Sequence, residues 1–269
     1  MAKITDPTYL QNTQYQNASN LDARSQLHAR FRTNHYGWFR WVFDQFELPP
    51  QARILELGCG SAQLWVENID RVPKGWNITL SDFSPGMVAA AQKNMAGSPH
   101  QFTFEIIDVQ SIPYDDQHFD VVMANHMLYH VPGRIKALSE IQRVLRFGGQ
   151  FYATTIGYEH MQELDDLVLK FNPNIELVFA RPDTQSFILE NGAAQLEQWF
   201  SNVSCQHYDD ALVVTEVEPL LNYILSTVTF TDDQLAGFTQ FLAQKLARDG
   251  SIHITKSSGL FAARRENDH

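Results

Sequence analysis

The chain has 269 residues, of which 44% are hydrophobic, and it carries a formal net charge of −11 at pH 7. This length and apolar content suit one large α/β domain, and an acidic chain without a run of Lys and Arg is a poor partner for nucleic acid. The two cysteines, Cys59 and Cys205, have no metal-ligand or redox spacing, which favours a reducing compartment, the cytoplasm, and no metal site. No apolar run approaches the roughly 18 residues of a membrane span.

The first expected element is an N-terminal helical cap. Aromatic residues recur on one helical face between residues 36 and 46, and Pro49 and Pro50 separate this segment from the rest. Beyond the prolines, short runs of β-branched and aromatic residues alternate with helical patterns. The expected strands are residues 53–57, 77–80, 102–107, 119–123 and 150–154. Strands separated by helices predict a parallel sheet, whose ligands bind beyond the carboxyl ends of the strands.

Two helices between these strands have readable boundaries. Ser84 supplies an N-cap and Pro85 the first helical position of a helix that Gly97 ends. Apolar residues at helical spacing from Ile135 to Leu145 predict a second helix, which the pair Gly148–Gly149 stops before the next strand.

After residue 156 the pattern is less regular. The expected helices cover residues 159–171, 193–200, 216–226 and 232–248, and the expected strands cover residues 203–208 and, with a bend, 251–263. The predicted fold is α/β: a Rossmann-like seven-stranded, mostly parallel sheet with helices on both faces, an antiparallel C-terminal strand and helical insertions. Within one structural domain we expect a cap (residues 1–50), a core (51–156) and a C-terminal part with helical lid insertions (157–269).

A glycine loop follows the first expected strand, in the stretch ILELGCGSAQL. Two glycines between a strand and a helix let the backbone approach a ligand. A dinucleotide-binding loop has a third glycine where this chain has Gln63, and Glu56 at the strand end repels a pyrophosphate. Glu56 favours a ligand with an ammonium group or hydroxyls. S-adenosylmethionine has both and carries no phosphate.

Acidic residues also end the next two strands. Asp82 is placed to accept both hydroxyls of a ribose, with an Asx turn as the alternative interpretation. Phe83 and Met87 are placed to cover the faces of an adenine, although core packing explains both residues equally well. Asp108 follows the third strand, where a carboxylate can accept the adenine amine while the adjacent Val109 backbone N–H serves a ring nitrogen. Taken alone, a surface-loop position explains Asp108 equally well.

Taken together, these motifs resemble the class I S-adenosylmethionine-dependent methyltransferases, in particular the small-molecule branch with ubiquinone/menaquinone-type enzymes (methyltransferase type 11). The stretches that carry the resemblance are ILELGCGSA, SDFSPGM, IIDVQSIPYDDQHFDVVMANHMLYHV and EIQRVLRFGGQFYATT, in that order. It covers residues 51–156 and, more weakly, the closing strand. It implies in-line transfer of a methyl group from S-adenosylmethionine to a small, partly apolar acceptor.

The resemblance also implies where the cofactor binds. The implied contacts are Glu56, Gly58, Cys59 and Gly60 for the methionine part, Asp82 for the ribose, Asp108 and Val109 for the adenine with Phe83 and Met87 beside it, and Asn125 or His126 under the amino-acid end. Two positions depart from the family pattern: Ala62 replaces a third glycine, and Phe147 replaces a proline before the fifth strand.

Candidate catalytic groups are few. Methyl transfer from a sulfonium needs no nucleophilic side chain, but a general base helps when the acceptor is a hydroxyl or an acidic carbon. His130, after the fourth strand, is the first candidate, with packing beneath the loop as an alternative of equal weight. Tyr36 and Tyr158 are further candidates, which packing in the cap or core explains at least as well.

Other functions remain open from the sequence alone. A nucleic-acid methyltransferase of the same fold is disfavoured by the acidic charge and by Asn125-His126-Met127-Leu128, where adenine-amine enzymes have Asn-Pro-Pro-aromatic. An NAD-dependent oxidoreductase is disfavoured by Glu56 and Gln63, and a non-catalytic S-adenosylmethionine-binding module is the third alternative. The expected partner is a small-molecule methyl acceptor, without nucleic acid. The acceptor's identity, the atom methylated and homo-oligomerisation stay open.

Overall fold

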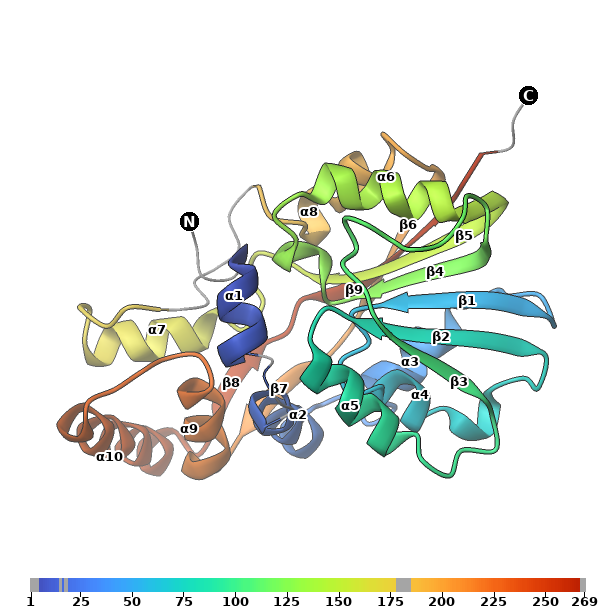
Figure 1. Cartoon of the computed structure of the whole chain (residues 1–269). Coiled ribbons are helices and arrows are strands. Elements are labelled where there is room, and N and C mark those ends of the chain that lie inside the picture. The colour runs from blue at the N-terminus through green and yellow to red at the C-terminus, as the bar shows by residue number, and fades with distance from the viewer. Residues whose placement is uncertain (1–4, 15, 17–18, 178–184, 267–269) are drawn as a thin grey trace.

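The computed structural model describes residues 5–14, 16, 19–177 and 185–266, and its centre is a seven-stranded sheet (Figure 1). The strands, in spatial order, are β3 (Phe102–Ile106), β2 (Trp76–Asp82), β1 (Ala52–Leu57), β4 (Phe119–Asn125), β5 (Leu145–Ile156), β9 (Ser258–Arg264) and β6 (Ser201–Tyr208). Six strands run in the same direction, and β9 alone runs opposite to them. The predicted seven-stranded sheet with one antiparallel C-terminal strand is therefore confirmed.

Helices cover both faces of this sheet because its strands are apolar on both sides. One face packs against α6 (Arg134–Val144) and α8 (Leu189–Leu196), and the other packs against α3 (Trp38–Asp44), α4 (Gln63–Val66) and α5 (Pro85–Asn94). The predicted start of α5 is confirmed, since the Ser84 side chain accepts a hydrogen bond from the Met87 backbone N–H at 3.3 Å.

A second hydrophobic cluster lies beyond the carboxyl ends of the strands and is called here the accessory layer. Its elements are α2 (Ser19–Phe31), α7 (Gln162–Phe171), α9 (Val217–Leu225), α10 (Asp232–Asp249) and the two-stranded sheet β7 (Ala211–Val214) with β8 (Ile252–Thr255). In Figure 1 the arrowheads of β1 and β2 point toward this layer. N-terminal α2 and C-terminal α9 pack side by side in it, so the two ends of the chain build one structure.

The remaining elements are short. They are α1 (Pro7–Tyr9) with the adjoining π-helix η2 (Leu10–Gln14), and the 3₁₀ turns η3 (Ile69–Arg71) and η4 (Leu128–His130). Among the described helices, none has the length and apolarity needed to cross a bilayer.

Four local predictions were wrong in detail. The expected closing strand with a bend is two strands, β8 and β9, in different sheets, and its partner β7 was not predicted. The pair Gly148–Gly149 lies inside β5, because the preceding helix already ends at Val144. Helix α8 begins four residues before the expected 193. Ile135 is 73% exposed, since it lies in the first turn of α6 on the side away from the sheet.

Candidate functional site

One cavity of about 700 Å³ opens between the sheet and the accessory layer. Its walls come from the carboxyl ends of β1, β2 and β4, the loops that follow them, the N-terminal segment of α1 and η2, helices α2 and α7, and the turn between β8 and β9. A smaller hollow of about 240 Å³ lies between α7, α10 and β8, away from those strand ends. No group of three or more metal-ligating side chains occurs in the part of the chain that the structure describes.

The glycine loop after β1 has a backbone that few residue types adopt. Gly58 and Gly60 have φ values of 69° and 54°, and Ala62, the departure from the family pattern, also has a left-handed φ of 64°. A Cβ on Gly58 would lie 2.8 Å from the Met127 Cβ, so a side chain there would push the loop away from the turn after β4. Cys59, whose backbone N–H donates to the Ser81 carbonyl, is buried, and burial raises the pKa of its thiol well above the usual range.

Glu56 lies buried at the end of β1 with both carboxylate oxygens engaged. Trp65 Nε1 donates to one oxygen at 2.6 Å, and Asn125 Nδ2 donates to the other at 2.8 Å. Burial raises the pKa of this carboxyl. The side-chain oxygen Oδ1 of Asn125, in contrast, is buried and has no hydrogen-bond partner among the described residues. A buried acceptor without a donor costs free energy until a donor reaches it, which fits a ligand with N–H groups in this cavity.

Asp82 is fixed at the end of β2 by backbone groups. Its two carboxylate oxygens accept hydrogen bonds from the Gly60 N–H at 3.0 Å and from the Ser84 N–H at 2.8 Å. The carboxylate therefore joins the glycine loop to the start of α5, and the Asx turn and ligand interpretations are compatible. Burial raises the pKa of Asp82 to about 6, so ionisation has a cost that a donor ligand would offset.

The other predicted cofactor positions also line this cavity. Met87 is fully buried there, whereas Phe83 is 40% exposed at its rim. Asp108 accepts a hydrogen bond from the Gln110 backbone N–H at 2.9 Å, which fixes the turn after β3, and Val109 is buried beside it. Three carboxylates from three strand ends, Glu56, Asp82 and Asp108, therefore face one cavity.

The turn after β4 brings two histidines to the cavity. His126 has a left-handed φ of 51°, and its backbone N–H donates to both the carbonyl and the side-chain oxygen of Thr154. Its ring lies 5.1 Å from the ring of Trp38, and burial lowers its pKa to about 4. His130 lines the same cavity at the end of η4, with its ring 4.5 Å from the ring of Tyr129.

Two of the predicted catalytic candidates do not line the cavity. Tyr36 lies just before α3 rather than on it, is 51% exposed, and its hydroxyl donates to Asp44 at 2.5 Å. Tyr158 is exposed after β5, where its backbone N–H donates to Glu190 at 3.0 Å. The expectation that these tyrosines reach the pocket is corrected, because each is directed outward by the chain around it.

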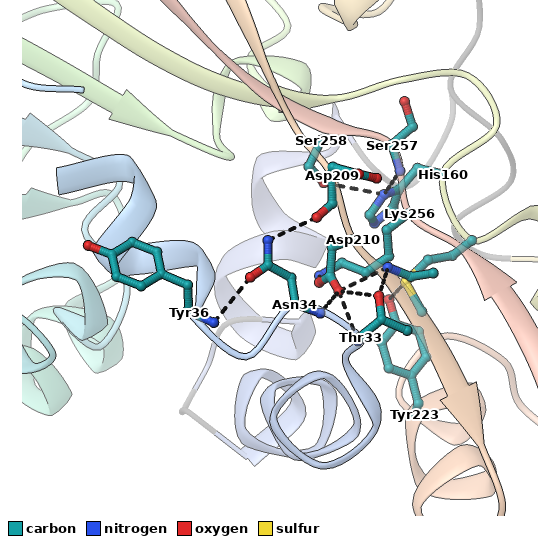
Figure 2. A network of polar contacts seen from close by, with 12 residues as sticks. Thr33, Asn34, Tyr36, His160, Asp209, Asp210, Tyr223, Lys256, Ser257 and Ser258 are labelled. Carbon is teal, nitrogen blue, oxygen red and sulfur yellow. Dashed lines mark hydrogen bonds and ion pairs between the residues drawn. The ribbon is translucent and has the colours of Figure 1, made fainter. Parts of the chain in front are cut away.

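The structure adds cavity residues that the sequence did not single out. His28, His160 and Lys256 come from α2, from the segment between β5 and α7, and from the turn after β8. Figure 2 shows Lys256 beside Asp210 and His160 beside Ser257 and Ser258, with Tyr36 apart from this group. No motif marks these three residues, and only the packing of α2, the segment after β5 and the turn after β8 brings them together.

The sheet order, the glycine loop and the cavity beyond β1 and β2 define a domain with the class I methyltransferase fold. The family comparison agrees with that class: residues 55–153 match the family model described as "Methyltransferase domain". Residues 55–153 thus match a methyltransferase domain, and the described structure continues before and after this stretch.

Curated relatives are similar to part of the chain. A ubiquinone/menaquinone biosynthesis C-methyltransferase UbiE from Geobacter sp. (strain M21) is 28% identical over 150 residues, covering 54% of this chain and 64% of that protein. A demethylmenaquinone methyltransferase from Desulfitobacterium hafniense (strain Y51) is 33% identical over 115 residues, covering 42% of this chain and 46% of the relative. The chain therefore spans less than two thirds of the length of these relatives.

Solved structures share the fold over most of the chain. A phosphoethanolamine N-methyltransferase 2 from Haemonchus contortus, solved in complex with S-adenosyl-L-methionine, has a TM-score of 0.60 at 17% identity and covers 96% of this chain and 59% of that one. A putative methyltransferase from Bacillus halodurans C-125 has a TM-score of 0.59 at 15% identity and covers 85% of this chain and 99% of that one. At such identities the likeness concerns the fold alone.

Proposed function

We propose that this protein is an S-adenosylmethionine-dependent methyltransferase that acts on a small, partly apolar molecule. The observation that carries the proposal is the single cavity in which Glu56, Asp82 and Asp108 face a glycine loop of left-handed backbone. The family match over residues 55–153 supports the same activity.

The residues at the strand ends fit this cofactor. Asp82, already fixed by two backbone N–H groups, has lone pairs left for the ribose hydroxyls. The orphan carbonyl oxygen of Asn125 fits the α-ammonium group, with Glu56 holding the Asn125 amide in place. Asp108 and Val109 are proposed to hold the adenine between Phe83 and Met87, and Gly58, Cys59, Gly60 and His126 to surround the methionine part.

The acceptor is proposed to bind in the other half of the cavity. Its apolar lining comes from α3, η4, α7 and α9 and includes Trp38, Phe39, Tyr129, Leu164 and Tyr223. These side chains would bury an apolar molecule and exclude water from the reacting atoms. A cavity of about 700 Å³ shared with a cofactor leaves room for a small acceptor and not for a folded nucleic acid.

S-adenosylmethionine supplies an electrophilic methyl group on a sulfonium. The chain's own contribution is to orient the acceptor for in-line attack and, where the acceptor must lose a proton, to receive it. His130 is proposed as that general base because it lines the cavity directly after β4.

The decisive experiment is a search for the acceptor. The protein is incubated with S-adenosylmethionine and a metabolite extract, and products heavier by one methyl group are identified by mass spectrometry. Calorimetry measures cofactor affinity separately. His130→Ala should lower turnover at least tenfold with little change in cofactor affinity, on the scale of general acid–base catalysis. Tight cofactor binding without any methylated product would favour a non-catalytic binding module. Protection against thermal unfolding by NADH and not by S-adenosylmethionine would disprove the proposal.

A further inference from the structure

The acceptor half of the cavity presents a group of nitrogen-bearing side chains, here called the donor wall: His28, His160 and Lys256. They lie on segments far apart in sequence, yet all three line the cavity. The carboxylates Glu56, Asp82 and Asp108 line it at the strand ends. The two ends of one cavity therefore differ in chemical character.

Lys256 is held rigidly on this wall. Its side chain is 8% exposed and forms an ion pair with Asp210, which is 1% exposed. Asp210 also accepts hydrogen bonds from the backbone N–H groups of Asn34 and Ala211, both at 2.9 Å, so the carboxylate cannot follow the lysine if that side chain moves. This bond to Asp210 uses one ammonium hydrogen, and no other hydrogen bond joins Lys256 to a described residue.

The position of the proton on His160 follows from its neighbours. The Ser257 backbone N–H donates to Nδ1 of His160 at 3.1 Å, and the Ser258 hydroxyl lies 3.4 Å from the same atom. Because Nδ1 accepts a hydrogen bond, the neutral ring carries its proton on Nε2. Burial lowers the pKa of His160 to about 3, so the ring is neutral at pH 7 and Nε2 is a donor.

His28 completes the wall from helix α2. Its Nδ1 atom is buried and has no hydrogen-bond partner among the described residues, and its ring lies edge-on to Tyr223 with the centroids 5.9 Å apart. Burial and the charge of Lys256 lower the pKa of His28 well below the usual range. A buried imidazole nitrogen without a partner favours a polar ligand group at this place.

Net charge alone does not explain the wall. Arg24 and Arg32 also line the cavity, but so do the carboxylates of Glu67 and Asp165. What distinguishes this half is that the N–H groups of Lys256 and His160 have directions fixed by their partners, the Asp210 carboxylate and the Ser257 backbone N–H. Fixed donors select an oxygen that carries negative charge, because charge-assisted hydrogen bonds are the strong ones.

We propose, building on the methyltransferase function above, that the acceptor carries an acidic oxygen, as a phenol, enol or carboxylic acid does, and that Lys256 and His160 hold it as the oxyanion. The apolar lining then holds the carbon skeleton. An amine acceptor is disfavoured, since its cationic form would face the Lys256 ammonium.

Matched probes test this directly. Benzoate and 1-naphthoate are compared with the neutral isosteres benzamide and 1-naphthamide and with the cations benzylammonium and 1-naphthylmethylammonium, by calorimetry with S-adenosylhomocysteine present. Each anion should bind at least tenfold more tightly than its neutral isostere, the scale of one charge-assisted hydrogen bond. If neither anion binds more tightly than its neutral counterpart, or if a cation binds best, the proposal is wrong.

One pair of single variants and one double variant separate donor loss from misfolding. His160→Asn keeps an acceptor for the Ser257 N–H but lacks the Nε2–H donor, whereas His160→Gln can present an N–H near the Nε2 position. The first should lose about tenfold in naphthoate affinity and the second less than threefold. Lys256→Met combined with Asp210→Asn removes the ion pair without leaving a buried charge, and should also lose about tenfold. Unchanged anion selectivity in both folded variants would overturn the assignment.

Cofactor affinity is measured on the same preparations. Absence of anion selectivity in the wild-type protein, with S-adenosylmethionine binding intact, would reject the donor wall and leave the methyltransferase proposal standing. Anion selectivity in a protein that does not bind S-adenosylmethionine would reject the methyltransferase proposal and leave the donor wall standing.

Discussion

The two halves of the cavity are built in different ways. The half at the strand ends comes from consecutive strand–loop units, in which Glu56, Asp82 and Asp108 each lie at or just after a strand end. The half on the accessory layer comes from α2, the segment after β5 and the turn between β8 and β9, more than 90 residues apart. A site built from local strand–loop units can be predicted from a single sequence. A site built from residues that are far apart in the sequence is recognised only in the tertiary structure.

The largest expected effect concerns the accessory layer as a structure in its own right. Phe238 is fully buried in its hydrophobic cluster, and Phe151 is equally buried in the sheet. Phe238→Ala and Phe151→Ala should each lower the free energy of unfolding by about 3–5 kcal/mol, measured by urea denaturation. A loss below about 1 kcal/mol for Phe238→Ala would mean that the accessory layer is not a packed core.

The cofactor half depends most on Asp82. Asp82→Ala removes the proposed acceptor for the ribose hydroxyls and should weaken S-adenosylmethionine binding by about 1.5–3 kcal/mol, measured calorimetrically. The same substitution should leave naphthoate affinity within threefold, since Asp82 lies in the other half. Equal cofactor affinity in wild type and variant would remove Asp82 from the site.

Asp82 also gives the ligand-free protein a pH dependence. Its pKa is raised from 3.8 to about 6 in the fold, so the native state binds more protons than the unfolded state between these values. Stability from this group is present below about pH 4 and is lost as the pH rises through 6, by at most about 3 kcal/mol. In the Asp82→Asn variant, the stability measured by thermal unfolding should not show this fall with rising pH. Saturating S-adenosylmethionine should reduce it in the wild type.

The N-terminal segment provides a smaller test. Pro7, Leu10 and Gln11 line the cavity, and a Cβ on Gly86 would lie 2.0 Å from the Gln16 carbonyl oxygen. Gly86→Ala should displace this segment and weaken S-adenosylmethionine binding by roughly threefold to tenfold, less than 1.4 kcal/mol. Lys93→Ala, an exposed substitution later in α5, is the matched control. Unchanged affinity would show that the segment does not cover the cofactor.

The smallest effect is expected at Tyr36. Its hydroxyl donates to Asp44 on the surface rather than into the cavity. Tyr36→Phe should therefore change turnover by less than about twofold and leave the midpoint of urea denaturation close to that of the wild type. A tenfold loss of turnover would return Tyr36 to the site and show that α3 moves during catalysis.

Much of the cofactor half can be read from local sequence patterns. The strand pattern predicts the sheet, and Ser84 with Pro85 predicts the start of α5, because caps and prolines act within one helical turn. No local pattern predicts that the side-chain oxygen of Asn125 lacks a hydrogen-bond partner, since the orientation of this amide depends on contacts with Glu56 of β1, which Trp65 of α4 also contacts.

The sequence by itself determined the order of strands and helices and the carboxylates at the strand ends, because short-range periodicity and turn chemistry specify them. Only the tertiary structure decided which way single side chains point. It directed Tyr36 outward to Asp44, and it placed Lys256 against Asp210 and His160 against Ser257 across long stretches of chain. These pairings depend on how α2 packs on β7 and on how β8 and β9 separate into two sheets, which no local pattern encodes.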